Sequence, residues 1–93
     1  MEHNPLQLRA KAIILGLKKK KIDKATAKSM FSALTADFFD EIGFDGEGRF
    51  DAFTMIMDII QDHLLYHEDV GDLEEYEERT VIDQFDTVNH GLF

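Results

Sequence analysis

Cysteine is absent from this chain of 93 residues, and so is any long apolar run. Without cysteine there is no disulfide framework and no thiolate chemistry, which makes the chain compatible with a reducing compartment. Polar residues interrupt the apolar stretch at 6–17, namely Gln7, Arg9 and Lys11, and this predicts neither a secretion signal nor a membrane span. We therefore expect a cytoplasmic protein.

Side chains that would identify a catalytic site are scarce. The only serines are Ser29 and Ser32, and neither has a base close to it in the sequence. No glycine loop has the spacing of a phosphate-binding motif. Carboxylates are so numerous that no pair can be singled out for acid–base work. We expect a protein that is not an enzyme and that uses no cofactor.

Basic residues are rare after residue 30. Residues 1–30 hold eight of the ten Lys and Arg side chains, and residues 31–93 hold seventeen of the nineteen Asp and Glu side chains. The first third thus carries about +6 and the remainder about −15. About five scattered acids would keep a chain of this size soluble, so the separation suggests a protein that works through its surface field.

A single helical domain over residues 1–93 is the fold that length and composition favour. A chain this short cannot divide its core, and 44% hydrophobic residues with eight Phe are enough to fold it. The apolar periodicity predicts four helices and no repeats. We expect an all-α protein, a compact four-helix bundle with a Gly-rich loop between the second and third helices.

Capping residues and apolar stripes indicate the first two helices. Asn4, Pro5 and Gln7 form a capping box, and the helix that follows runs to about Lys19. Its inner stripe is widened by Leu8, Ala12 and Leu15, so we expect most of it to be enclosed; the stripe is Leu6, Ala10, Ile13, Ile14 and Leu17. Asp23 caps the second helix, which Gly43 ends; its stripe is Ala27, Met30, Phe31, Leu34, Phe38 and Ile42.

Two further helices follow the glycine-rich stretch 43–49. The third begins at about Phe50 and is the most apolar segment, with Phe53, Ile56, Met57, Ile60 and Leu64 on one face and Met55, Ile59 and Leu65 beside it. Asp72 and Glu75 form a capping box that opens the fourth. Its expected inner residues are Leu73, Tyr76, Val81, Phe85 and Val88.

Two features invite a metal-binding interpretation. The glycine-rich loop fits part of an EF-hand register, with Asp45, Glu47, Gly48, Phe50 and Asp51 at suitable places. That register puts Gly43 and Thr54 where the two end ligands belong, so both anchors are missing. His63 and His67 are one helical turn apart, with Asp62, Glu68 or Asp69 as conceivable third ligands, but two histidines are more often plain helix surface. We predict no metal site and keep a metal-responsive module as an alternative.

Acidic side chains crowd the region after the third helix. Charge runs often form a solvated helix face. The functional hypothesis is that the cluster imitates a phosphate backbone or matches a basic groove, with two tyrosines as anchors. The predicted partner-binding residues are Asp51, Asp58, Asp62, Tyr66, Glu68, Asp69, Asp72, Glu74, Glu75, Tyr76, Glu77 and Glu78.

The order of helices and charges resembles the colicin D type of immunity protein and the related contact-dependent-inhibition immunity proteins. The likeness lies in an apolar first helix, a basic joint such as Lys20-Lys21-Ile22, and an acidic final helix at 73–85. It spans most of the chain as a pattern of helices and charge, without a specific motif. The resemblance implies that acidic side chains cover the active site of a basic tRNA-cleaving toxin.

A second, local resemblance concerns the turn. Glu41-Ile42-Gly43 with Glu47-Gly48-Arg49 looks like the turn in the anti-sigma factor of T-even phages, although the flanking sequence departs from it. This resemblance would imply binding to RNA polymerase.

These observations predict a stoichiometric inhibitor that masks a basic nuclease, toxin or polymerase component. It would contact neither nucleic acid nor membrane directly, and a homodimer is compatible with the charge pattern. Reversing Glu74, Glu75, Glu77 and Glu78 to Lys is expected to abolish binding and leave the fold intact. A further alternative is an assembly subunit, in which the basic part of one copy meets the acidic part of the next.

Overall fold

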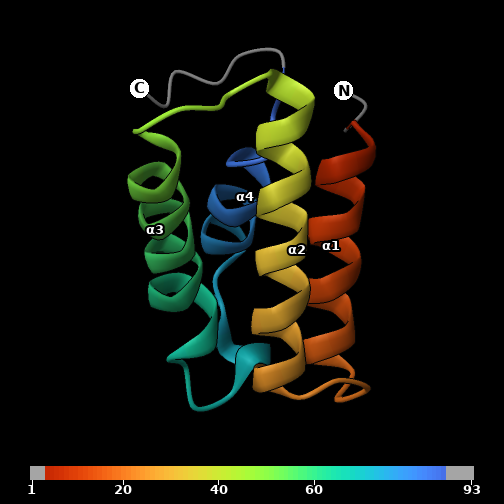
Figure 1. The fold of residues 1–93 in the computed structure, drawn as a ribbon. Coiled ribbons are helices and arrows are strands. Elements are labelled where there is room, and N and C mark those ends of the chain that lie inside the picture. Colours follow the sequence, from red (N-terminus) through yellow and green to blue (C-terminus); the bar gives the residue numbers. More distant parts are fainter. Residues whose placement is uncertain (1–3, 88–93) are drawn as a thin grey trace.

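Four α-helices form an up-and-down bundle in the computed structural model, which describes residues 4–87 (Figure 1). They are α1 (Pro5–Lys18), α2 (Lys24–Ile42), α3 (Arg49–Ile60) and α4 (Glu75–Asp83). Helix α3 continues into a π-helical turn, η1 (Gln61–Leu65), and a short 3₁₀ turn, η2 (Val70–Asp72), precedes α4. Residues 4–87 contain no strand. The all-α bundle with its Gly-rich loop is confirmed.

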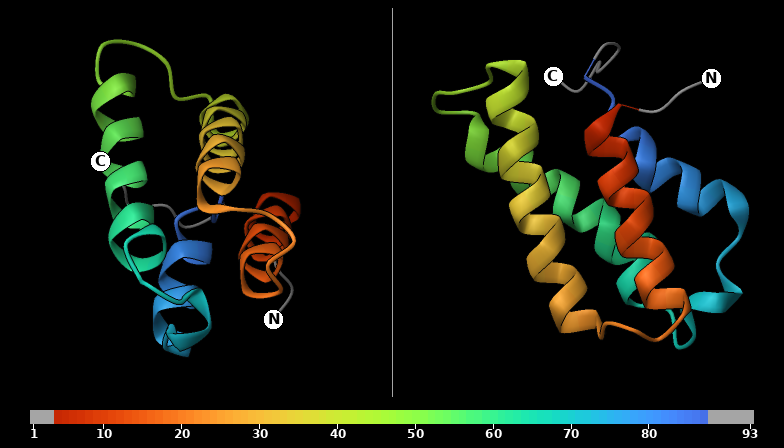
Figure 2. Two further views of the ribbon diagram at one scale, coloured as in Figure 1. Left: turned by 90° about the horizontal axis from the view of Figure 1, so that it is seen from below. Right: turned by 90° about the vertical axis from the view of Figure 1, so that its right-hand side faces the viewer.

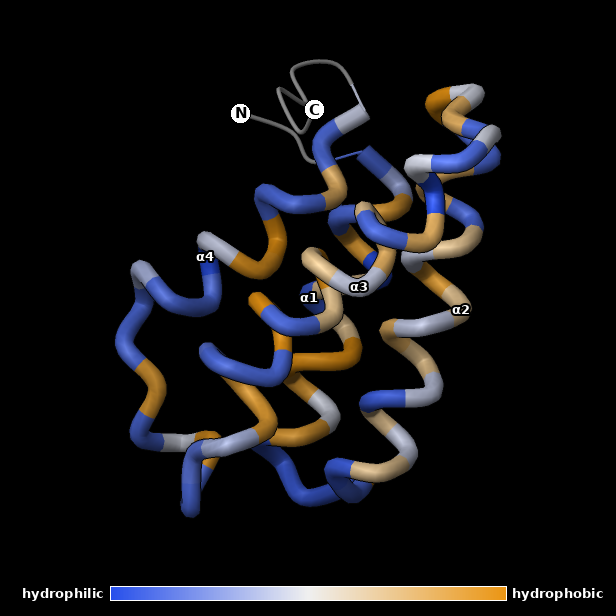
Figure 3. The backbone as a smooth tube through the Cα atoms, turned by 60° about the vertical axis from the view of Figure 1, so that its left-hand side comes forward, coloured by the Kyte–Doolittle hydropathy of each residue, from blue (hydrophilic) through white to orange (hydrophobic). Residues whose placement is uncertain are grey.

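The helices occupy the four corners of the bundle. Helix α1 packs against α2 and α4, α2 packs against α3, and α4 packs against η1. Helices α1 and α3 are therefore diagonally opposite (Figure 2). The basic joint between α1 and α2 lies at the same end of the molecule as the turn after η1, and both are hydrophilic (Figures 1 and 3). The Gly-rich loop lies at the other end.

The predicted caps of α1 and α2 are present. The Gln7 backbone N–H donates to the Asn4 side chain over 2.9 Å, and the Asn4 backbone donates to the Gln7 side chain over 3.1 Å. Asp23 accepts a hydrogen bond of 2.7 Å from the Thr26 backbone. Gly43 ends α2 in the left-handed region, with φ 73°. Local sequence therefore determines these helix ends, because each cap uses residues within four positions of the helix terminus.

The start of α4 differs from the prediction. Glu74 is the N-cap and Glu77 completes the capping box, whereas Asp72 belongs to η2. The intervening residue, Leu73, has extended backbone and is buried in the core. Burial of this side chain forces the chain to turn before the helix begins, so the predicted pairing of Asp72 with Glu75 is wrong.

Phenylalanine rings fill the centre of the core. Phe85, just after α4, lies parallel to Phe31 at 6.4 Å and meets Phe38 edge-on at 5.8 Å, both measured between ring centroids. The Phe85 carbonyl also accepts a hydrogen bond of 3.0 Å from the Asn4 side chain. Packing of Phe85 thus holds the end of α4 against α2. Asn4, which also caps α1, holds it to the start of α1.

Several apolar residues expected inside are exposed instead. On α1, Leu8 and Leu15 are 53% and 43% exposed, and Ala12 is exposed between them. The expectation that most of α1 is enclosed is therefore wrong, because α2, α4 and η2 leave its outer side uncovered. Met30, Met55 and Tyr76 are likewise exposed, and Val88 lies outside the described residues. The other stripe residues lie in the core or pack partly buried against it; Ile59 is half-buried.

Candidate functional site

Exposed carboxylates and two exposed tyrosines line the turn after η1 and the start of α4. Tyr66 and Tyr76 are 73% and 62% exposed. No ion pair engages Glu68, Asp69, Asp72 or Glu74 within residues 4–87, and Glu75 pairs with Arg79 over 3.2 Å on the surface. We call this set the α4 acidic surface: Tyr66, Glu68, Asp69, Asp72, Glu74, Glu75 and Tyr76.

Glu77 lies beneath this surface and is used inside the molecule. Its side chain is 13% exposed, and its Oε2 lies 3.2 Å from His67 Nε2 and 3.6 Å from His63 Nδ1. Its Oε1 accepts the Glu74 backbone N–H over 3.1 Å. That hydrogen bond lowers the pKa of Glu77 most, the His67 imidazole lowers it further, and partial burial opposes both. Glu77 thus joins η1 and the following turn to α4.

Lysines from the basic third of the sequence also hold this region. Lys18, at the end of α1, forms an ion pair with Glu78 of α4, and both side chains are mostly buried. Lys24, at the start of α2, donates a hydrogen bond to the His67 backbone carbonyl. Two of the predicted partner-binding residues, Glu77 and Glu78, are therefore committed to contacts between elements.

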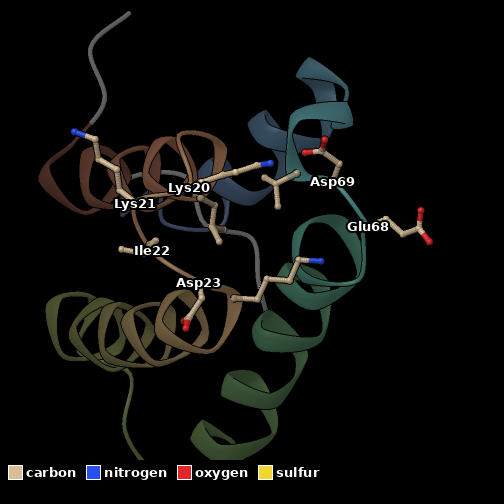
Figure 4. A pocket seen from close by; sticks show the side chains of 9 residues that line it. Lys20, Lys21, Ile22, Asp23, Glu68 and Asp69 are labelled. Carbon is tan, nitrogen blue, oxygen red and sulfur yellow. The ribbon is translucent and has the colours of Figure 1, made fainter.

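The basic joint faces the acidic turn across a shallow surface cavity of about 490 Å³. Lys20, Lys21, Asp23, Glu68 and Asp69 line it, together with Leu17, Ile22, Lys24 and Val70 (Figure 4). The Lys20 side chain extends toward the Asp69 side of the cavity (Figure 4). Basic residues from the first third of the sequence and acidic residues from its last third thus line one cavity in the fold.

Asp51 and Asp58 of α3 lie apart from this turn, whereas Asp62 is in η1, the segment that leads into it. Asp51, Asp58 and Asp62 are exposed, and none of them forms an ion pair with a described residue. Asp51 is in the first turn of α3, at the end of the molecule that carries the Gly-rich loop (Figure 1). The structure therefore places Asp51 and Asp58 along α3, away from the carboxylates around the start of α4, and Asp62 on η1, which packs against α4.

The Gly-rich loop does not have the form of an EF-hand. Helix α2 ends at Ile42 and α3 begins at Arg49, so half of a twelve-residue register starting at Gly43 is already helical. Arg49 pairs with Asp40 at 2.7 Å, and its guanidinium lies 5.8 Å from the centre of the Phe39 ring. Phe44 packs on the same ring, with 5.4 Å between centroids. These contacts close the loop against α2.

The two histidines contact a carboxylate that was not among the third ligands expected from the sequence. Neither Asp62, Glu68 nor Asp69 contacts the imidazoles; the carboxylate that does is Glu77, ten residues beyond His67. The sequence does contain a pattern that predicts the position of Glu77, because Glu74 and Glu77 have the spacing of a capping box. Within residues 4–87 no group of three or more His, Asp or Glu side chains is arranged to hold a metal ion.

Among the described residues no helix is both long and apolar enough to cross a membrane. Comparisons with protein-family models, with curated proteins and with solved structures find no match to this chain.

Proposed function

We propose that this protein binds and neutralises a basic partner that handles nucleic acid, such as a nuclease, a toxin or a polymerase component. The observation that supports this most is the α4 acidic surface. It combines four carboxylates without an ion-pair partner in residues 4–87 with two tyrosines that are more than half exposed. It follows the pattern of the small acidic immunity proteins that the sequence resembles.

The two tyrosines give this surface exposed aromatic area, which a solvated run of charges lacks. Tyrosine is enriched at the centres of interfaces, because a rigid ring buries a large apolar area at little entropic cost. Tyr66 and Tyr76 flank the carboxylates, and the Tyr66 hydroxyl is held by the Gln61 side chain at 3.2 Å. A partner can therefore bury aromatic area where its basic side chains meet the acids.

The contacts beneath the α4 acidic surface hold the elements that carry it in one arrangement. The Glu77 contacts and the Lys18–Glu78 ion pair hold the start of α4 against η1 and α1. A surface that is already ordered loses less conformational entropy on binding. The carboxylates also raise the encounter rate with a basic partner, and salt weakens that effect.

The test compares two variants with the same change in charge. The first reverses Glu68, Asp72 and Glu75 to Lys on the α4 acidic surface, and leaves the N-cap Glu74 in place. The control reverses Glu41, Asp45 and Glu47 to Lys near the Gly-rich loop, where all three are exposed. Glu77 and Glu78 stay unchanged, because their reversal would disrupt internal contacts. Circular dichroism checks that both variants are folded.

Tagged wild-type protein is used to capture partners from host lysate at low and high salt, and mass spectrometry identifies them. We expect one basic protein that acts on nucleic acid, retained at low salt and lost at high salt. With that partner purified, the α4 variant should bind at least about tenfold more weakly, a loss of about 1.4 kcal/mol, while the control binds like the wild type. Equal binding by both variants would contradict the proposal.

A further inference from the structure

Helix α1 has an apolar stripe on the side that faces away from the bundle. Leu8, Ala12 and Leu15 lie at helical spacing on one exposed face, opposite the buried residues Ala10 and Ile14. Leu8 and Leu15 are among the few large apolar side chains that the described fold leaves open. An apolar stripe of this kind on a charged molecule is typical of a contact surface.

The charges that α1 itself contributes beside this stripe are all positive, although Arg9 is paired with Asp37 of α2 and Lys11 lines a cavity with Glu75 of α4. Helix α1 contains no acidic residue; its charged side chains are Arg9, Lys11 and Lys18, and Lys19 follows at its end. Lys11 and Lys19 are exposed and form no ion pair within residues 4–87. This outer face of α1, defined by Leu8, Lys11, Ala12, Leu15 and Lys19, therefore fits an apolar surface edged with carboxylates.

The same chain carries such a surface on α3. Asp51 and Asp58 lie two turns apart on its exposed side, and Met55 between them is 45% exposed. Phe50, in the first turn, is 75% exposed. The only cation of α3, Arg49, is turned toward α2, where it pairs with Asp40. The outer face of α3, defined by Phe50, Asp51, Met55 and Asp58, is thus both acidic and apolar.

The spacing of charges on the two faces is similar. Lys11 and Lys19 are about 12 Å apart along the axis of α1, and Asp51 and Asp58 are about 10.5 Å apart along α3. Because α1 and α3 are diagonally opposite in the bundle, their outer faces point away from each other (Figure 2). One molecule cannot bring its own two faces together, so the contact must join different molecules.

We infer that copies of this chain associate head to tail, with the outer face of α1 from one copy on the outer face of α3 from the next. Pairing α1 with α1 would oppose cations with cations, and pairing α3 with α3 would oppose carboxylates. The contact is heterologous, so it leaves one free face at each end and permits chains to grow. It uses neither tyrosine nor any carboxylate of the α4 acidic surface.

The test uses two variants that each block one face. Leu8→Glu/Leu15→Glu blocks the α1 face, and Asp51→Lys/Asp58→Lys blocks the α3 face. Each is measured alone and in an equimolar mixture by sedimentation velocity, at about 10 mM salt, where the screening length is about 30 Å, and at about 1 M, where it is about 3 Å. Asp51→Asn/Asp58→Asn replaces the second variant if Lys in the first turn of α3 lowers its stability.

At low salt the wild type should form species larger than the 10.7 kDa chain, and these should dissociate at high salt. Each blocked variant alone should remain a monomer. Their mixture should form a dimer and nothing larger, because only one unblocked α1 face and one unblocked α3 face remain. Glu68→Lys/Asp72→Lys should associate like the wild type, which separates this contact from the α4 acidic surface.

Three results would overturn the inference. The first is a wild type that stays monomeric at low salt and about millimolar concentration, near the weak limit of specific association. The second is a mixture of blocked variants that does not dimerise. The third is a complex that needs Leu8 and Leu15 but contains another protein or a lipid vesicle in place of a second copy. None of these results bears on partner binding by α4.

Discussion

Glu77 makes three contacts with one carboxylate, and these explain why it is shielded although it stands in the most acidic part of the chain. It completes the capping box of α4 and accepts contacts from two histidines on η1 and the following turn. The lowered pKa of Glu77 means that the folded state favours its charged form.

We expect Glu77→Gln to lower stability at neutral pH and to have less effect in acid. The amide keeps an acceptor for the Glu74 backbone but removes the charge that faces His63 and His67. Since the folded pKa of Glu77 lies below the unfolded value of 4.5, the wild-type advantage is present above pH 4.5 and is lost as the pH falls through the folded pKa.

Urea unfolding from pH 7 to pH 3 measures this difference. Asp83→Asn is the control, because Asp83 is exposed on the same helix and its side chain forms no ion pair or hydrogen bond in residues 4–87. A gap between wild type and Glu77→Gln that widens toward pH 3 would contradict the assignment.

The ion pair between Lys18 and Glu78 is a second contact in which a single side chain is expected to contribute to stability. Glu78 Oε1 is fully buried, so Lys18→Met leaves a carboxylate oxygen without a partner and should cost about 1–3 kcal/mol. Lys18→Met/Glu78→Met should recover most of that loss, since replacing both charges with apolar groups is often neutral.

Denaturant unfolding of the four proteins in this double-mutant cycle measures the coupling. Lys19→Met, at the next and exposed position, is the control for loss of one cation. If Lys18→Met were no more destabilising than Lys19→Met, the ion pair would contribute little.

At the scale of elements, the Gly-rich loop owes its shape to one backbone conformation and one anchor. Gly43 ends α2 at φ 73°, and Arg49 at the start of α3 returns to α2 through Asp40 and the Ala36 carbonyl. These contacts set the position of α3 and hence the direction of its aspartates.

Replacing Gly43 by Ala should destabilise the protein by about 1–2 kcal/mol, because a side chain in the left-handed region is strained. Gly48→Ala is the matched control: its φ is −80°, and a Cβ there would meet Phe44 at an ordinary 3.6 Å. Thermal unfolding followed by circular dichroism measures both. Equal melting temperatures for the two variants would show that the turn can adopt another conformation.

Helix α4 depends on tertiary contacts more than the other helices do. It has nine residues, which is too short for stability in isolation. Phe85 packing on α2, the Asn4 bond to the Phe85 carbonyl, and Glu77 hold it in place. The α4 acidic surface is therefore presented only when the whole bundle is folded.

At the scale of the molecule, a net charge of −9 at pH 7 opposes association in general, and the predicted head-to-tail contact must overcome it locally. Lowering the pH toward the isoelectric point of about 4.7 removes this repulsion.

We therefore expect light scattering by the wild type to reach a maximum near pH 4.7. The triple reversal of Glu41, Asp45 and Glu47 to Lys changes the net charge from −9 to −3 and should move that maximum to higher pH. A maximum at the same pH for both proteins would mean that a particular contact, rather than net charge, controls association in acid.

Much of the fold could be predicted from the sequence because its determinants are local. Asn4 with Gln7, Asp23 with Thr26 and Gly43 each act within one turn of a helix end, and the apolar periodicity of α2 and α3 needs no neighbour to be recognised. The start of α4 was predicted wrongly because the sequence allows two capping boxes that overlap, Asp72 with Glu75 and Glu74 with Glu77. Burial of Leu73 decided between them.

The sequence by itself determined the helix number, the caps of α1 and α2, and the separation of charge along the chain. Only the tertiary structure decided which charges stay free: Lys18 and Lys24 reach the acidic region, and Glu77 and Glu78 become internal. It also decided that Leu8 and Leu15 face outward, because α1 has neighbours on one side alone. Helix ends depend on interactions within a few residues, whereas exposure and ion pairing depend on which elements pack together.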